Sequence, residues 1–167
     1  MIKISYKRSD YLQDMIDNIK LLDNVVELGC HVGISTQIIS RLCQDGSVYA
    51  YDNSPESTKA MRKLQIENKN IIFKNADVRN SDIIKKQAQL DDIDVLCVDL
   101  GGGYHPDTVF KVFFLWSSIL KPRVTLIRNQ GLMEFVNASQ TKDETDTSGG
   151  YLKIASSAIV QKNTSKN

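Results

Sequence analysis

A glycine-containing turn in residues 25–53 constrains the fold more than any other part of this sequence. An apolar, β-branched run ends at Gly29, a helical pattern follows Gly33, and a second apolar run ends at Asp52. This order of strand, glycine turn, helix, strand and acid is typical of nucleoside-binding units at the carboxyl ends of parallel strands. Gly29 permits a tight turn close to a ligand, and the amides that begin the next helix favour an anionic group. Asp52 is placed to accept hydrogen bonds from ribose hydroxyls.

The glycine spacing argues against a dinucleotide oxidoreductase. The dinucleotide fingerprint G-x-G-x-x-G places its third glycine five positions after the first. In this chain Gly33 follows Gly29 by four positions, and the middle position is His31. The remaining alternative to a nucleoside site is a strand–helix–strand unit whose glycines serve packing alone.

The pattern Glu27-x-Gly29-x-x-x-Gly33, followed by a distant acid, resembles the first motif of class I S-adenosylmethionine-dependent methyltransferases. Members of that family usually read E/D-x-G-x-G-x-G, so His31 departs from the motif. The resemblance covers residues 25–128 and implies a Rossmann-like methyltransferase fold that binds S-adenosylmethionine.

Apolar periodicity predicts regular alternation of strands and helices along the chain. Strands are expected at 25–28, 47–51, 71–73, 93–98 and 124–127. Helices are expected at 10–22, from Gly33 to about residue 44, from Ser54 to about Asn68, at 81–89 and from Pro106 to Leu120. This alternation predicts an α/β fold, a doubly wound and mostly parallel sheet with helices on both faces.

The sequence signal weakens after Arg128. Residues 137–150 are polar and predict a mobile loop, and residues 151–160 read as one last strand. Since the methyltransferase family generally closes its sheet with a two-stranded hairpin, the resemblance implies a fold shortened at the C-terminal hairpin. We expect a single domain over residues 1–160 and a flexible tail over 161–167.

Composition describes a chain of ordinary globular character. Of the 167 residues 41% are hydrophobic and 25% are charged, and the net charge of +1 gives no whole-chain argument for nucleic acid binding. The sequence shows no secretory signal and no apolar run of membrane-spanning length. Three cysteines without C-x-x-C spacing predict reduced thiols in a cytoplasmic protein.

The resemblance also assigns cofactor-binding residues. Asp52 with Asn53 would bind the ribose, and Asp77 with Val78 would lie by the adenine. The first-motif loop adds Glu27, Gly29, Cys30, His31 and Gly33. Asp99, at the end of the fourth predicted strand, would border the sulfonium and the substrate. Each acid has a structural alternative: Asp52 as a turn residue, Asp77 as a strand-end cap and Asp99 as part of a glycine-rich turn.

Charge and reaction chemistry favour the cofactor interpretation. S-adenosylmethionine carries a sulfonium and an ammonium, which the acids Glu27 and Asp99 suit. Methyl transfer needs alignment first and a base only when the acceptor holds a proton, and the candidate bases are Asp99 and His105. No metal site is expected, because Cys30 and His31 have no third ligand nearby.

The sequence defines the acceptor of the methyl group less clearly than it defines the cofactor. In the family, the branch that methylates RNA ribose uses a Lys-Asp-Lys-Glu set, of which Asp99 matches the acid. Arg128 follows the fifth strand where a lysine is expected, and Glu134 matches the last position only loosely. The chain lacks an obvious substrate-capping insertion, which favours a macromolecular acceptor, RNA or protein, or a lid from a second subunit of a homodimer. The rival hypothesis is a non-catalytic nucleoside-binding or partner-regulating module.

Overall fold

Six parallel strands form one sheet in the computed structural model, which describes residues 1–89, 92–142 and 149–152. The strand order is β1-β6-β5-β2-β3-β4. The strands are β1 (Ile2–Ser5), β2 (Asn24–Leu28), β3 (Ser47–Asp52), β4 (Ile71–Asn75), β5 (Val95–Val98) and β6 (Val124–Arg128). The helices are α1 (Arg8–Asn18), α2 (Ile34–Leu42), α3 (Pro55–Glu67), α4 (Ser81–Gln87), α5 (Pro106–Leu120) and α6 (Gln130–Ala138), with a short 3₁₀ turn, η1 (Gly101–Gly103).

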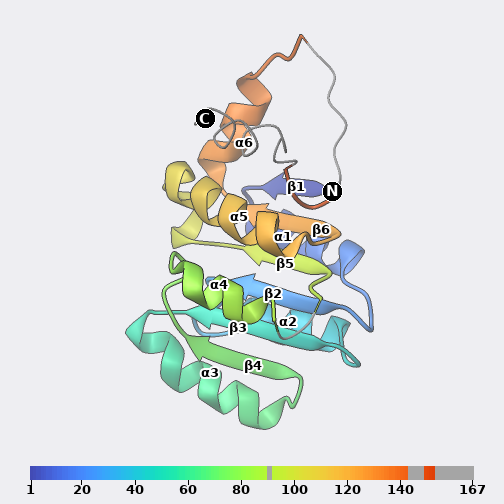
Figure 1. Ribbon diagram of the computed structural model, residues 1–167, viewed down its shortest axis with the longest axis vertical. Coiled ribbons are helices and arrows are strands. Elements are labelled where there is room, and N and C mark those ends of the chain that lie inside the picture. The colour runs from blue at the N-terminus through green and yellow to red at the C-terminus, as the bar shows by residue number, and fades with distance from the viewer. Residues whose placement is uncertain (90–91, 143–148, 153–167) are drawn as a thin grey trace, which may run out of the picture.

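Helices cover both faces of the sheet, with α4 and α5 on one face and α1 to α3 on the other (Figure 1). Strand β5 shows why this arrangement is stable, because all four of its residues are buried. Val95 and Cys97 join the core under α1 to α3, while Leu96 and Val98 join the core under α4 and α5. A strand buried on both faces is typical of parallel sheets, and the predicted doubly wound α/β fold is confirmed.

Two elements were not predicted from the sequence, β1 and α6. Strand β1 pairs in parallel with β6 at the edge of the sheet, and α6 extends away from the same edge (Figure 1). Helix α1 is shorter than the predicted 10–22, since Ile19 has extended backbone angles and follows the last helical residue. Helix α6 covers the beginning of the predicted loop 137–150. The predicted strand 151–160, after its first two residues, and the predicted tail 161–167 lie outside the described residues.

Because all strands are parallel, the carboxyl ends of all six lie along the same edge of the sheet, across the strands rather than beside β1. Gly29 follows β2, Asp52 ends β3, Asp77 lies two residues after β4, and Asp99 follows β5. The four positions that the sequence places after successive strands therefore meet at this edge, where α/β folds bind their ligands.

Candidate functional site

A cavity of about 530 Å³ opens at this edge, within the size range of small-molecule sites. Most of the predicted site residues line it: Gly29, His31, Asp52, Asn53, Asp77, Val78 and Asp99. It is also lined by residues that were not assigned to a site from the sequence: Tyr51, Ser54, Ala76, Arg79, Thr108 and Arg128. The segment Leu100-Gly101, which follows Asp99, lines it as well.

The other predicted site residues lie outside the cavity lining. Glu27, in β2, and Cys30, in the first-motif loop, are each 2% exposed. Gly33 begins α2 and packs on α3, where an added Cβ would lie 2.2 Å from Leu64 Cδ1. His105 is exposed and immediately precedes α5, with a positive φ of 59°. A direct contact of these four residues with a ligand stays a prediction.

Gly29 brings two strand ends into close contact. Its φ is +89°, and an added Cβ would lie 2.1 Å from the carbonyl oxygen of Asp99. Its N–H donates to the carbonyl of Tyr51 at 2.9 Å. Glycine is therefore required at this position for backbone reasons, because the end of β2 approaches the end of β5 too closely for any side chain.

Asp52 connects the first-motif loop to the turn after β3. Its Oδ2 accepts from the His31 N–H at 2.8 Å, and its Oδ1 accepts from the Ser54 N–H at 2.7 Å. His31 has a left-handed φ of 46°, a conformation that is uncommon for residues other than glycine. Because each carboxylate oxygen accepts more than one hydrogen bond, Asp52 keeps capacity for ribose hydroxyls while it holds the loop.

Glu27 is a buried carboxyl that accepts two short side-chain hydrogen bonds. Ser35 Oγ donates at 2.5 Å and Thr36 Oγ1 at 2.6 Å, both from the beginning of α2. Burial raises the pKa of Glu27 to about 7, although these hydrogen bonds lower it in part. The acid of the first motif thus anchors α2 under the loop and titrates near neutral pH.

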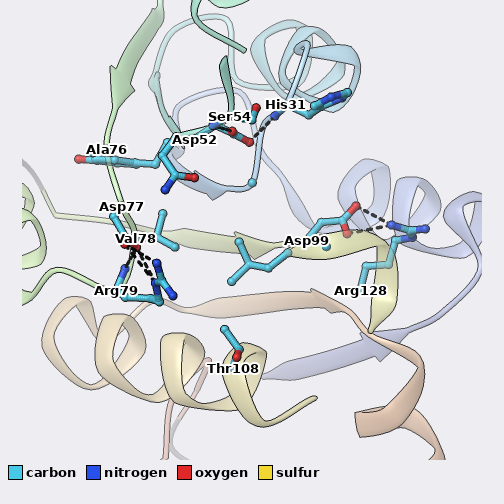
Figure 2. A pocket seen from close by; sticks show the side chains of 15 residues that line it. His31, Asp52, Ser54, Ala76, Asp77, Val78, Arg79, Asp99, Thr108 and Arg128 are labelled. Atoms are coloured by element: carbon cyan, nitrogen blue, oxygen red, sulfur yellow. Dashed lines mark hydrogen bonds and ion pairs between the residues drawn. The ribbon is translucent and has the colours of Figure 1, made fainter. Parts of the chain in front are cut away.

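Asp77 pairs with Arg79 at one end of the cavity (Figure 2). Arg79 Nη2 donates to Asp77 Oδ2 at 2.6 Å, and Nε donates to both carboxylate oxygens. These hydrogen bonds lower the pKa of Asp77. Val78, the residue between these two in the sequence, is held in place by Trp116, whose Nε1–H donates to the Val78 carbonyl at 2.7 Å.

Asp99 and Arg128 face each other at the other end of the cavity (Figure 2). Arg128 Nη1 donates to both carboxylate oxygens of Asp99, at 2.8 and 2.9 Å. Burial raises the pKa of Asp99, while the charge and hydrogen bonds of Arg128 act in the opposite direction. This pair replaces the Asp–Lys pair considered from the sequence, and it fixes the orientation of the Asp99 carboxylate.

The comparison with protein families decides the identity of this fold. A family model described as a methyltransferase domain matches residues 26–129. The chain belongs to the methyltransferase-domain family. The match includes Glu27, Gly29, Asp52, Asp77 and Asp99, and it ends just after Arg128. The methyltransferase family that the first motif predicted is confirmed.

Curated relatives of this methyltransferase-domain protein include ribosomal RNA methyltransferases. Ribosomal RNA small subunit methyltransferase H of Clostridium botulinum (strain Kyoto / Type A2) is 23% identical over 137 residues, which are 79% of this chain and 44% of that protein. The homologue of strain Okra is 26% identical over 106 residues, which are 61% of this chain and 34% of that protein. The chain therefore spans less than half the length of these relatives.

Solved structures with the same fold include a putative caffeoyl-CoA O-methyltransferase from Staphylococcus aureus, with a TM-score of 0.56, 13% identity and coverage of 80% of this chain and 70% of that one. An rRNA methylase from Streptococcus thermophilus has a TM-score of 0.53, 16% identity and coverage of 78% and 76%. Aeropyrum pernix fibrillarin, solved with natively bound S-adenosyl-L-methionine, has a TM-score of 0.52, 17% identity and coverage of 68% and 44%. At these identities the similarity shows the fold.

No helix among the described residues is long and apolar enough to cross a membrane.

Proposed function

We propose that this chain binds S-adenosylmethionine in the cavity and transfers its methyl group to an RNA acceptor. The observation that carries the proposal is the convergence of Asp52, Asp77 and Asp99 around one cavity at the carboxyl ends of three strands. The donor set suits the cofactor, because carboxylates match its ribose hydroxyls, its exocyclic amine and its cationic groups. RNA as the acceptor is supported by the ribosomal RNA methyltransferases among the relatives.

The residues of the cavity divide the work between binding and alignment. Asp52 would hold the ribose, and Asp77 with Val78 would hold the adenine. When bound, the cofactor supplies an electrophilic methyl group on a sulfonium, and the sulfur keeps the electron pair of the broken bond. Asp99, oriented by Arg128, would lie beside the acceptor and would take its proton where the acceptor atom carries one.

A matched pair of variants tests this proposal. Asp99→Asn keeps the shape of the side chain and removes the charge, while Asp107→Asn makes the same change at an exposed position on α5. Calorimetry measures the binding of S-adenosylmethionine and S-adenosylhomocysteine. Transfer from tritiated S-adenosylmethionine to small-subunit ribosomal RNA measures activity.

We expect Asp99→Asn to lower turnover by about 10²–10⁴ if Asp99 is the base, and to leave binding of S-adenosylhomocysteine, which lacks the sulfonium charge, nearly unchanged. Asp107→Asn should match the wild type in both assays. A wild-type chain that binds neither cofactor would refute the proposal.

The non-catalytic alternative has one observation in its favour, since both oxygens of Asp99 are already held by Arg128. This alternative predicts that the chain binds the cofactor but does not convert it to S-adenosylhomocysteine when RNA is present. The cytoplasmic location and the homodimer expected from the sequence stay predictions, and gel filtration tests the latter.

A further inference from the structure

The two ends of the cavity differ in what they can accept. The Asp52 and Asp77 end has the groups that suit a nucleoside, and the opposite end is formed by Asp99 and Arg128 (Figure 2). If the cofactor lies as proposed above, its methyl group points to the second end. The acceptor must therefore approach across the elements that surround Asp99 and Arg128.

Strand β1 brings additional residues to this second end. The parallel register of β1 with β6 places Ser5 beside Arg128. Tyr6, Lys7 and Arg8 therefore follow the carboxyl end of β1, on the same side of the sheet as the cavity. Asn129 fixes this arrangement: its N–H donates to the Ser5 carbonyl at 2.9 Å, and its side-chain amide donates to the Tyr104 carbonyl at 3.0 Å. The side chain of Asn129 is fully buried.

Two cations beside Asp99 and Arg128, Lys7 and Arg8, carry charge that no ion pair among the described residues neutralises. Lys7 and Arg8 are exposed and make no ion pair with any residue that the structure describes. Arg8 lies close enough to Asp99 for its charge to lower the pKa of that carboxyl. Arg128 uses only Nη1 to hold Asp99, and within the described ranges its Nη2 has no hydrogen-bond partner.

Two tyrosines belong to the segments that carry these cations: Tyr6 precedes Lys7, and the Tyr104 carbonyl is bonded by Asn129, the neighbour of Arg128. Tyr6 packs over Gly103 in the turn after β5, where an added Cβ would lie 3.3 Å from the Tyr6 ring. The next residue, Tyr104, is 64% exposed. Cations that track a phosphate backbone, together with exposed rings on which bases stack, are the combination that binds single-stranded nucleic acid.

We propose that Arg8, Tyr104 and Arg128 form the acceptor surface of this chain, on which single-stranded RNA lies with a phosphate at Arg8 and a base stacked on Tyr104. This inference rests on the proposed function, and it names the part of the molecule that positions the RNA. It also gives β1 a role, because β1 carries Arg8 to the edge of the cavity.

Fluorescence anisotropy with a labelled single-stranded RNA, in the presence of S-adenosylhomocysteine, tests the acceptor surface. Arg8→Gln should weaken RNA binding about two- to fivefold, the range of a solvent-exposed ion pair, and should reduce the salt slope by about 0.7. Arg41→Gln is the matched control, since Arg41 is exposed near the end of α2 and so at the opposite edge of the sheet. Tyr104→Ala should weaken binding about tenfold without a change in salt slope.

Cofactor binding separates the two proposals. Arg8→Gln and Tyr104→Ala should bind S-adenosylmethionine as the wild type does. If the wild type methylates RNA while Arg8→Gln and Tyr104→Ala behave like Arg41→Gln, the acceptor surface is refuted and the proposed function stands. If the wild type binds the cofactor but methylates a protein and not RNA, the RNA acceptor and this surface are both refuted.

Discussion

The buried carboxyl of Glu27 should make the stability of this fold depend on pH close to neutrality. Burial raises the pKa of Glu27 from its ordinary value of 4.5 to about 7. Between these values the folded chain holds a proton that the unfolded chain has released. The stabilising contribution of Glu27 is therefore complete below pH 4.5 and is lost as the pH rises to 7. At about 1.4 kcal/mol per pH unit, the loss amounts to about 3 kcal/mol.

Glu27→Gln isolates this effect. The amide cannot ionise, and its oxygen and NH₂ group remain able to bond the hydroxyls of Ser35 and Thr36. Urea denaturation from pH 4 to pH 8 can be followed by the fluorescence of Trp116, the single tryptophan of the chain. The free energy of unfolding of the variant relative to the wild type should rise by about 3 kcal/mol over this range. Parallel curves for the two proteins would refute the argument.

Ser35→Ala provides the opposite perturbation. It keeps the carboxyl of Glu27 and removes a hydrogen bond that lowers its pKa. The pKa should then rise further, so stability should fall further above pH 7 than in the wild type. A shallower pH dependence in Ser35→Ala would contradict the assignment.

Three other substitutions test the backbone and the lining of the cavity. Gly29→Ala should destabilise the fold by about 3 kcal/mol or more, because its Cβ would overlap the Asp99 carbonyl oxygen; unchanged thermal stability would show that β2 and β5 can separate. Asp52→Ala should weaken S-adenosylmethionine binding about ten- to a hundredfold in calorimetry, and a change under twofold would remove Asp52 from the ribose site. Trp116→Phe should lower stability by about 1–3 kcal/mol in urea denaturation followed by circular dichroism, since the buried Val78 carbonyl loses its donor; an unchanged midpoint would show that water replaces the indole.

The sheet from β2 to β6 could be predicted because its sequence signals are local. Apolar runs of four to six residues end at Gly29, Asp52 and Asp99, and Pro55 and Pro106 mark the beginnings of helices. In contrast, Ile2–Ser5 is a short alternating segment whose partner lies at the far end of the chain. Helix α6 is only nine residues long and has no buried residue, so it lacks the long buried apolar stripe that marks a core helix such as α5.

The acidic residues of the site could be predicted from the sequence, whereas the roles of its cationic residues could not. Asp52, Asp77 and Asp99 lie at the end of a strand or within two residues of it, and the positions of strands can be predicted from the sequence. The pairing of Asp99 with Arg128 joins residues that are 29 positions apart, and it depends on β5 and β6 being neighbours. Arg79 could have been found from its position two residues after Asp77. The close approach of Gly29 to the Asp99 carbonyl is a tertiary contact, so the sequence could predict a tight turn at Gly29 but not that a larger residue there would destabilise the fold.

The pairing of β1 with β6 also orders events during synthesis. The amino group of Met1 and the carbonyl of Arg123 form a hydrogen bond across 122 positions of sequence, which a ribosome needs roughly 6–24 s to translate. Throughout that interval β1 has no partner strand, while β2, β3, β4 and β5 can pair with one another as they emerge. A nascent chain that has emerged up to the end of β5 therefore holds the strands that surround the nucleoside end, and the edge that carries Arg8 joins the sheet last.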